Sequence, residues 1–184
     1  IEYKKTAHNL RLKALGAVTD ANRLQVVDVH IRNNDYGAAR RLVREKWNEL
    51  QPHLSIGNRL LFVEMRSGRM KEAMEVGAAI EKHGAPDEVT YALMSGLHAF
   101  YRQYDKANEY LRNAILAGQE SPTTITSATY IAFRRNDTNA INSQVQELLR
   151  RNIAEPETFF YLSTLQFYAG DFMCWFKGFK QWNR

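Results

Sequence analysis

Apolar residues recur every three or four positions on both sides of short polar turns. In one segment they are Ile56, Leu60, Leu61 and Val63 before the turn, and Met70, Ala73, Val76 and Ile80 after it. The next segment repeats the scheme with Tyr91, Met94 and Leu97, then Tyr104, Ala107, Leu111 and Ala114. These spacings predict one apolar stripe on each helix of a helical hairpin. A single hairpin cannot bury its stripes alone, so we expect the hairpins to pack in series.

The prolines mark the ends of these units. The chain has four of them, Pro52, Pro86, Pro122 and Pro156, at spacings of 34, 36 and 34 residues. Proline inside a helix removes a hydrogen bond and clashes with the preceding turn. Prolines at near-constant spacing therefore indicate the boundaries of a repeating helical unit.

A turn motif recurs between the prolines. It begins at Asn34, Gly68, Arg102, Asn136 and Gly170, and it places Ala39, Ala73, Ala107, Ile141 and Trp175 at intervals of 34 residues. Asn and Gly suit the left-handed backbone that ends a helix, and Asp suits the cap of the next one. A small residue such as alanine, where two antiparallel helices cross, lets their backbones approach closely.

This pattern resembles the tetratricopeptide repeat. That repeat is a 34-residue helix–turn–helix unit whose turn carries an aromatic residue, with a small residue three positions later. The resemblance implies an all-α, right-handed superhelical solenoid of about five repeats, at residues 20–53, 54–87, 88–121, 122–155 and 156–184. Residues 3–18 would form the second helix of a partial repeat, with Ala7, Leu10, Ala14 and Leu15 on its apolar face. Several positions depart from the pattern: Arg23, Gly57 and Ile125 stand where the family has a large aromatic, and Trp175 replaces the crossing alanine.

In such a solenoid the first helices would line a concave groove that holds a protein or peptide. The resemblance places Asn58, Arg59, Phe62, Arg66, Tyr130 and Phe133 in that groove. The groove would run from polar and basic to aromatic, which suits a peptide that is acidic at one end and apolar at the other. Alternatively, the aromatic residues belong to the core between repeats.

The charge is uneven along the chain. The net charge is +5, but residues 1–72 hold 14 Lys/Arg against 8 Asp/Glu, a net of +6, and residues 73–184 hold 11 against 12, a net of −1. A basic half could attract an acidic protein, nucleic acid or anionic lipid, or it could be a solvated helix surface. Arg40, Arg41, Arg44 and Lys46 on one helix make nucleic-acid binding the rival function, although the groove positions lack a recurrent pair of base-reading side chains.

The C-terminal stretch is rich in aromatic residues. Phe172, Trp175, Phe176, Phe179 and Trp182 would form a last helix without a polar cap. This pattern predicts that the natural protein continues, that the stretch pairs with a second copy as a homodimer, or that it binds a partner. Because the chain begins at Ile1 instead of Met, we expect a fragment of a longer protein, placed as a scaffold, spacer or dimerisation segment in a larger secretion, pilus or envelope assembly.

The sequence contains no recognisable catalytic pattern. It lacks a glycine-rich phosphate loop, the metalloprotease helix motif and paired cysteines, and its five histidines are scattered. We therefore expect no enzyme activity, no metal and no cofactor. The lone Cys174 lies among apolar residues and reads as a buried thiol. No apolar run is long enough to cross a membrane. The cytoplasm is the favoured compartment, with the periplasm as the alternative.

Overall fold

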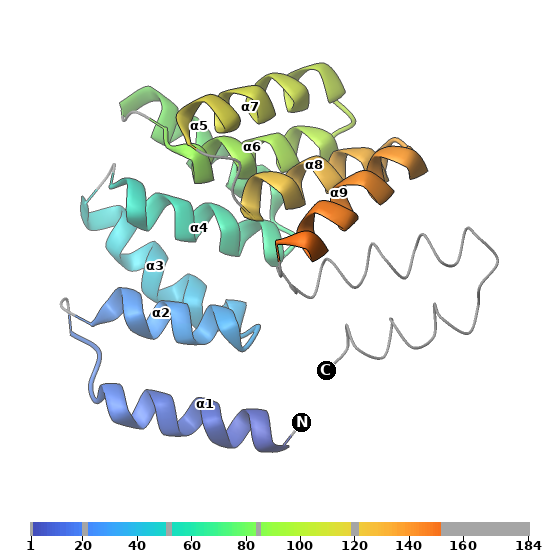
Figure 1. The fold of residues 1–184 in the computed structure, drawn as a ribbon. Helices are drawn as coiled ribbons and strands as arrows, with labels where there is room; N and C mark the ends of the chain where they lie inside the picture. The colour runs from blue at the N-terminus through green and yellow to red at the C-terminus, as the bar shows by residue number, and fades with distance from the viewer. Residues whose placement is uncertain (1, 20–21, 51–52, 84–85, 119–121, 152–184) are drawn as a thin grey trace. The chain divides into compact units, whose positions relative to one another are not determined.

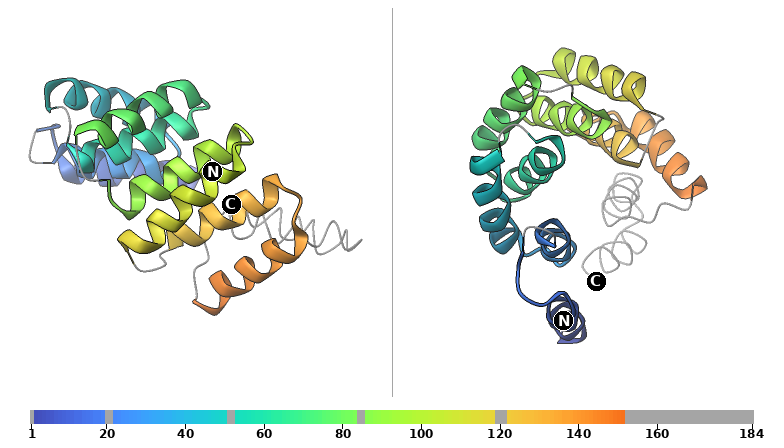
Figure 2. Two further views of the ribbon diagram at one scale, coloured as in Figure 1. Left: turned by 90° about the horizontal axis from the view of Figure 1, so that it is seen from above. Right: turned by 90° about the vertical axis from the view of Figure 1, so that its left-hand side faces the viewer.

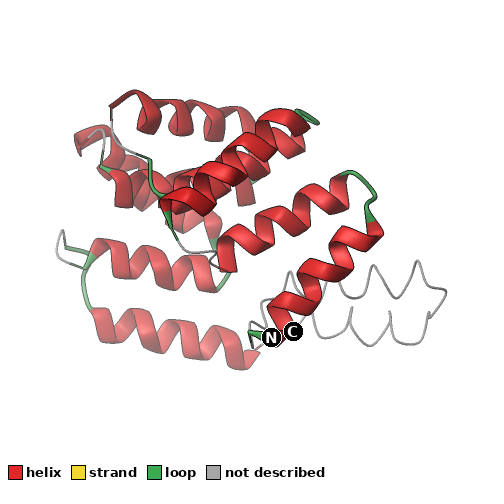
Figure 3. Cartoon of the chain, turned by 45° about the horizontal axis from the view of Figure 1, so that its top comes forward, coloured by secondary structure: helices red, strands yellow, loops and turns green. Residues whose placement is uncertain are grey.

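The computed structural model describes residues 2–19, 22–50, 53–83, 86–118 and 122–151. Every regular element in these ranges is a helix, as Figure 3 shows. The packing divides the chain into two compact units, residues 1–86 and 87–184. The boundary lies one residue before residue 87, which is the predicted end of the second repeat. The fold class predicted from the apolar spacing, an all-α helical repeat, is confirmed.

The described residues of the first unit form five helices, and each packs against its neighbour in the sequence (Figure 1). They are α1 (Glu2–Leu15), α2 (Arg23–Arg32), α3 (Tyr36–Leu50), α4 (Leu54–Arg66) and α5 (Met70–His83). The pairs α2–α3 and α4–α5 are the first two hairpins. In the right-hand view of Figure 2, α2 and α4 occupy one layer of this unit, and α3 and α5 the other.

The second unit contains four helices within the described residues. They are α6 (Glu88–Phe100), α7 (Tyr104–Ala117), α8 (Pro122–Arg134) and α9 (Thr138–Arg150). The helices pair as α6–α7 and α8–α9, and α8 also packs against α6. Two hydrogen bonds connect α8 to α6: Ser127 Oγ donates to the Ala92 carbonyl, and Thr124 Oγ1 donates to Glu88 Oε1. Pro122 is the first residue of α8, where its missing N–H costs the helix nothing.

All four described turns within the hairpins share one backbone geometry. A residue with positive φ ends each first helix, at intervals of 34 residues: Asn34 (60°), Gly68 (74°), Arg102 (59°) and Asn136 (57°). The next residue donates its N–H five residues back, as from Asp35 to His30 and from Asp137 to Ala132, both at 2.9 Å. This is the Schellman arrangement, and it satisfies carbonyls that the helix end leaves open.

Two of these turns also carry the predicted aspartate caps. Asp35 Oδ1 accepts from the Ala38 N–H at 3.2 Å, and Asp137 Oδ1 accepts from the Ala140 N–H at 3.0 Å. The predicted role of Asn and Gly in the turns is confirmed as well. Arg102 is the exception, because arginine has no intrinsic preference for a left-handed backbone and the repeat geometry imposes it.

The predicted crossing positions within the described residues are buried between the helices. Ala39, Ala73, Ala107 and Ile141 are fully buried. Larger apolar residues of the predicted stripes surround them, among them Leu60, Leu61 and Ile80 in the first unit. In the second unit, Ile141 packs with Ala132 and Val145 in one buried cluster. The core is therefore a series of interfaces between helices, as the periodicity predicts.

Gly57 replaces the aromatic that the repeat pattern has in this helix, and its neighbours explain why. It is buried, and a Cβ added there would lie 2.8 Å from Ile80 Cδ1 and 2.9 Å from Trp47 Cζ3. The bulk that the pattern puts on the first helix thus comes from the second helices on either side, α3 and α5. A small residue on α4 is thus compensated by large residues on the neighbouring helices, so that the interface stays filled.

The first helix differs from its prediction in one respect. The helix ends at Leu15, followed by Gly16 with φ of 71°. Leu10 was predicted to lie on the apolar face of a partial repeat, yet it is 62% exposed, and Ala14 is also exposed. The prediction for these two residues was wrong. In the described part of the first unit, α1 packs against α2, and that contact covers neither Leu10 nor Ala14.

Candidate partner-binding surfaces

Arg59 on α4 is tied to Asp28 on α2. Its Nε and Nη2 donate to the two carboxylate oxygens, both at 2.8 Å, and its Nη1 donates to the Ser55 carbonyl and hydroxyl. The hydrogen bonds that Arg59 donates to the Asp28 carboxylate raise the pKa of Arg59 above its ordinary value. Bidentate pairs of this kind fix geometry as well as charge. The pair therefore locks the first hairpin to the second, and any acidic ligand of Arg59 has to compete with Asp28.

Arg66, at the end of α4, lies over two aromatic rings. Its Cζ is 5.6 Å from the centroid of the Tyr36 ring and 5.9 Å from that of Phe62. Its Nε donates to the Tyr36 hydroxyl at 3.1 Å. The two rings meet edge to face, with centroids 6.4 Å apart. Arg66 remains exposed, so these contacts hold an accessible guanidinium in one orientation.

The second unit repeats this cluster 68 residues, or two repeats, further along. Tyr104, Tyr130 and Arg134 occupy the positions of Tyr36, Phe62 and Arg66. Arg134 Cζ lies 5.9 Å from the Tyr130 ring, and Arg134 Nη1 donates to the Tyr130 hydroxyl at 3.2 Å. We call these two groups the arginine–aromatic clusters: Tyr36, Phe62 and Arg66 in the first unit, and Tyr104, Tyr130 and Arg134 in the second.

The contacts within the second cluster differ in detail. Arg134 also lies over Phe100, with Cζ 5.4 Å from the ring centroid, and its Nη2 donates to the Phe100 carbonyl at 3.0 Å. Tyr104 instead donates its hydroxyl to the Arg134 carbonyl at 2.9 Å, and Arg135 covers its ring. The two clusters share one plan. The tyrosine lies on the second helix of one hairpin (α3 or α7), and the other aromatic residue and the arginine lie on the first helix of the following hairpin (α4 or α8), with the arginine in its last turn.

Comparison with known structures bears on the fold. The sequence matches no known protein family and no curated protein. Among the 17 matching chains of solved structures is one in the crystal structure of the APC/C hetero-tetramer Cut9–Hcn1. The two share 15% sequence identity with a TM-score of 0.67, and the match covers 86% of this chain. This likeness shows the fold alone, which is an all-α helical repeat. The chain spans 32% of the length of that Cut9–Hcn1 chain.

Not all of the groove residues predicted from the tetratricopeptide resemblance present their side chains to solvent. Asn58 is buried, with 9% of its surface exposed, and offers a partner little area. Tyr130 and Phe133 are half-buried and pack against the cluster of Ala132, Ile141 and Val145. The sequence left two alternatives for the aromatic residues, groove or core. These two side chains contribute to the core while keeping part of their surface exposed.

The basic helix α3 holds most of its cations in contacts within the chain. Arg40 and Arg44 donate to the carboxylate of Glu64 on α4, and Lys46 pairs with Glu49 at 3.0 Å. The side chain of Glu64 has no exposed surface. From the sequence, the four basic residues of this helix made it a candidate phosphate-binding surface for the rival nucleic-acid function. In the structure, two of its four cations instead neutralise one buried carboxylate and join the first hairpin to the second.

The remaining predictions concern the aromatic C-terminal stretch, metal binding and membrane helices. The aromatic residues Phe172, Trp175, Phe176, Phe179 and Trp182, together with Cys174, lie outside the described residues. Within the described ranges, no three His, Cys, Asp or Glu side chains gather as they would around a metal ion. None of the helices in those same ranges is both long and apolar enough to cross a bilayer.

Proposed function

We propose that this tetratricopeptide-like chain is a scaffold that binds another protein through the exposed surface of its first helices. The observation that carries the proposal is the recurrence of one arginine–aromatic cluster in both units, at equivalent positions. Tyrosine and arginine are the residues most enriched at the energetic centres of protein interfaces. The proposed contacts are Arg59, Phe62 and Arg66 in the first unit, and Tyr130, Phe133 and Arg134 in the second.

The geometry of Arg66 suits recognition because its position is already set. Long side chains lose conformational freedom when a partner immobilises them, which costs roughly 0.5–1.5 kcal/mol for each one. Tyr36 and Phe62 hold Arg66 in place before any partner arrives. The rings contribute apolar area, and the guanidinium contributes directional donors for carboxylate or carbonyl groups. A peptide or helix with acidic and apolar side chains matches this combination.

Photo-crosslinking can test whether this surface meets a partner. A photoreactive amino acid is placed at Ser67, which is exposed and adjacent to Arg66, and in a matched protein at Ala78, which is exposed on α5. Crosslinked proteins from the native host are identified by mass spectrometry. We expect a specific protein to be captured from Ser67 and not from Ala78. The same set of proteins from both positions would count against the proposed surface.

The affinity of the captured partner, once purified, gives the second measurement. Replacing a well-placed interface arginine commonly costs 1–2 kcal/mol, so Arg66→Ala and Arg134→Ala should each raise the Kd roughly tenfold. Arg41→Ala is the matched control, since Arg41 is an exposed arginine on α3 outside both clusters. Equal affinities for all three variants would refute the role of the clusters. Melting temperatures of the variants distinguish lost contacts from lost folding.

A further inference from the structure

We infer that the cleft between α1 and α2 is a second binding site in the first unit, specific for an acidic segment with neighbouring aliphatic side chains. The cleft has a volume of about 370 Å³. It is lined by residues of both helices: Arg11, Ala14, Leu15, Gln25, Asp28, Val29 and Arg32. The inference rests on the proposed scaffold function and adds a second place, lined by other residues, for the acidic and apolar ligand chemistry that the cluster around Arg66 also matches.

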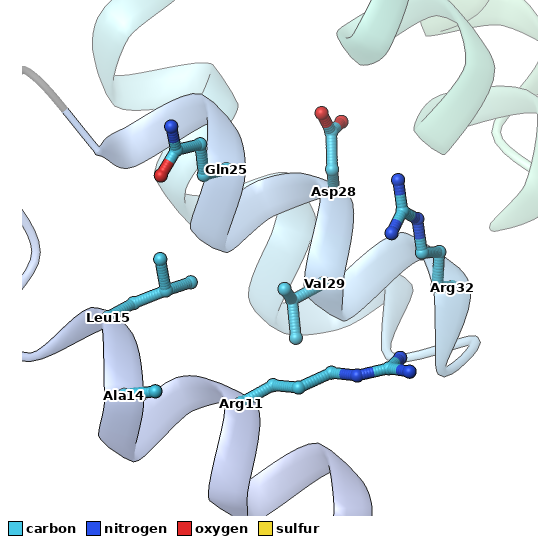
Figure 4. A pocket seen from close by; sticks show the side chains of 7 residues that line it. All are labelled: Arg11, Ala14, Leu15, Gln25, Asp28, Val29 and Arg32. Atoms are coloured by element: carbon cyan, nitrogen blue, oxygen red, sulfur yellow. The ribbon is translucent and has the colours of Figure 1, made fainter.

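The floor of the cleft is apolar. Leu15 from α1 and Val29 from α2 point toward one another, with Ala14 beside them (Figure 4). Leu15 and Val29 are half-buried, and Ala14 is exposed. An aliphatic side chain seated here would remove apolar surface from water on both helices. Ala14 lines the cleft and is exposed, so α1 and α2 pack incompletely at this place.

Two arginines stand at one end of this floor. Arg11 extends beneath Val29 toward the end at which Arg32 lies (Figure 4). Both are exposed, and neither forms a salt bridge with any carboxylate of the described residues. In Figure 4 the Arg11 guanidinium lies on the α1 side of this end and the Arg32 guanidinium is turned away from α1, so each leaves a positive charge there that a carboxylate can match. The pair therefore selects an anion.

The acidic residue of the cleft does not cancel this charge. In Figure 4, the carboxylate of Asp28 points away from α1. It is held there by the bidentate bond to Arg59 on α4, so its charge is already matched outside the cleft. The surroundings are basic as well, because residues 1–72 carry a net charge of +6. The positive electrostatic field steers an acidic segment toward the cleft. The apolar floor favours a segment that also carries aliphatic side chains over one that is only charged.

Fluorescence anisotropy with the full chain tests this directly. The probe is a fluorescein-labelled octapeptide of alternating glutamate and leucine, and its control has glutamine in place of every glutamate. We expect the glutamate peptide to bind about tenfold more tightly than the glutamine peptide, as loss of charge-assisted hydrogen bonds predicts. Added salt should weaken the binding, because the arginines are exposed. Absent or equal binding of the two peptides would overturn the inference.

Three variants locate the binding. Arg11→Gln and Arg32→Gln keep the length of the side chain and remove its charge, and each should weaken binding of the glutamate peptide about fivefold. Arg41→Gln is the matched control and should bind like the unchanged chain. On methyl-labelled protein, the NMR signals of Leu15 and Val29 should shift when the peptide is added. Unchanged affinity in the two cleft variants, or unshifted methyl signals, would contradict the site.

The outcomes separate this inference from the proposed function. A single-stranded thymidine octanucleotide is added as a competitor. If it displaces the glutamate peptide and binds more tightly, the cleft is a phosphate site and the inference is wrong. If the glutamate peptide fails to bind while Ser67 crosslinks a specific protein, the scaffold stands and the cleft does not. If the peptide shifts the NMR signals of Leu15 and Val29 while a photoreactive residue at position 67 captures no specific protein, the cleft is supported and the proposed surface of the first helices is not.

Discussion

Replacing Glu64 with glutamine should destabilise the first unit more than any comparable change of a surface carboxylate. The side chain of Glu64 has no exposed surface, and its two oxygens accept from Arg40 Nε at 3.1 and 3.0 Å. Arg44 Nη2 donates to one of them at 2.7 Å. These bonds connect α3 to α4. Glu64→Gln keeps the shape of the side chain, removes its charge and leaves it one oxygen acceptor.

The size of the effect follows from the exposure of the arginines. Breaking a fully buried ion pair by removing one partner costs about 3–5 kcal/mol, because a charge stays buried without compensation. Here the side chains of Arg40 and Arg44 are 29% and 32% exposed, so water can solvate them in part. The glutamine oxygen also retains one hydrogen bond from a charged arginine, worth about 1.5–3 kcal/mol. We therefore expect a loss of roughly 2–3 kcal/mol, below the fully buried case.

Urea denaturation followed by circular dichroism measures this loss. A change of that size should also lower the Tm by roughly 5–10 °C. The control is Glu49→Gln, since the side chain of Glu49 is 51% exposed and its pair with Lys46 should contribute less than about 1 kcal/mol. Combining Glu64→Gln with Arg44→Gln should give less than the sum of the single losses. Additive losses, or a Glu64→Gln loss no greater than the control, would refute the reasoning.

Two further changes test the packing and the electrostatics. Gly57→Ala should lower the free energy of unfolding by roughly 1–2 kcal/mol in the same urea assay, because the added Cβ would lie 2.8 Å from Ile80, and this clash outweighs the better helix propensity of alanine. The control is Gly37→Ala, whose added Cβ meets no close neighbour and which should stabilise the protein. Equal effects of the two changes would contradict this explanation. The hydrogen bond from Arg150 holds the pKa of Glu147 at about 2, below its ordinary 4.5, so its stabilisation is present above pH 4.5 and is lost as the pH falls toward 2. In an NMR titration Arg150→Gln should raise this pKa, and an ordinary pKa in the unchanged chain would disprove the bond.

Short-range features of the fold were predictable because each depends on residues close together in the sequence. Asn34, Gly68 and Asn136 take the left-handed backbone that their residue types favour, and they do so at the predicted interval. Ala39 and Ala107 are buried at the predicted crossings. Leu10 shows the limit of this reasoning. Helical periodicity assigns a side chain to a face of its helix, but only the neighbouring helices decide whether that face is covered.

The candidate sites depend on contacts that no local pattern contains. The sequence suggested Arg59 and Arg66 as groove residues, and their roles as partner contacts remain predictions. It gave no sign that Asp28 would hold Arg59, or that Tyr36 would support Arg66. The duplicated arginine–aromatic cluster could have been found from sequence, since Tyr36 and Tyr104 are two repeats apart and so are Arg66 and Arg134. The match appears at an interval of two repeats and not of one, because Gly96 and Phe100 stand at the intermediate positions of Phe62 and Arg66.

The sequence by itself determined the helices, their turns and their division into repeats, since these follow from helical periodicity and backbone preference over a few residues. Only the tertiary structure decided which charges remain available to a partner. Glu64 binds arginines 20 and 24 residues away, and Asp28 binds Arg59 across 31 residues. Such pairs form when packing brings separate helices together. Pairing and burial then change the electrostatic role of a side chain without any change in the local sequence pattern.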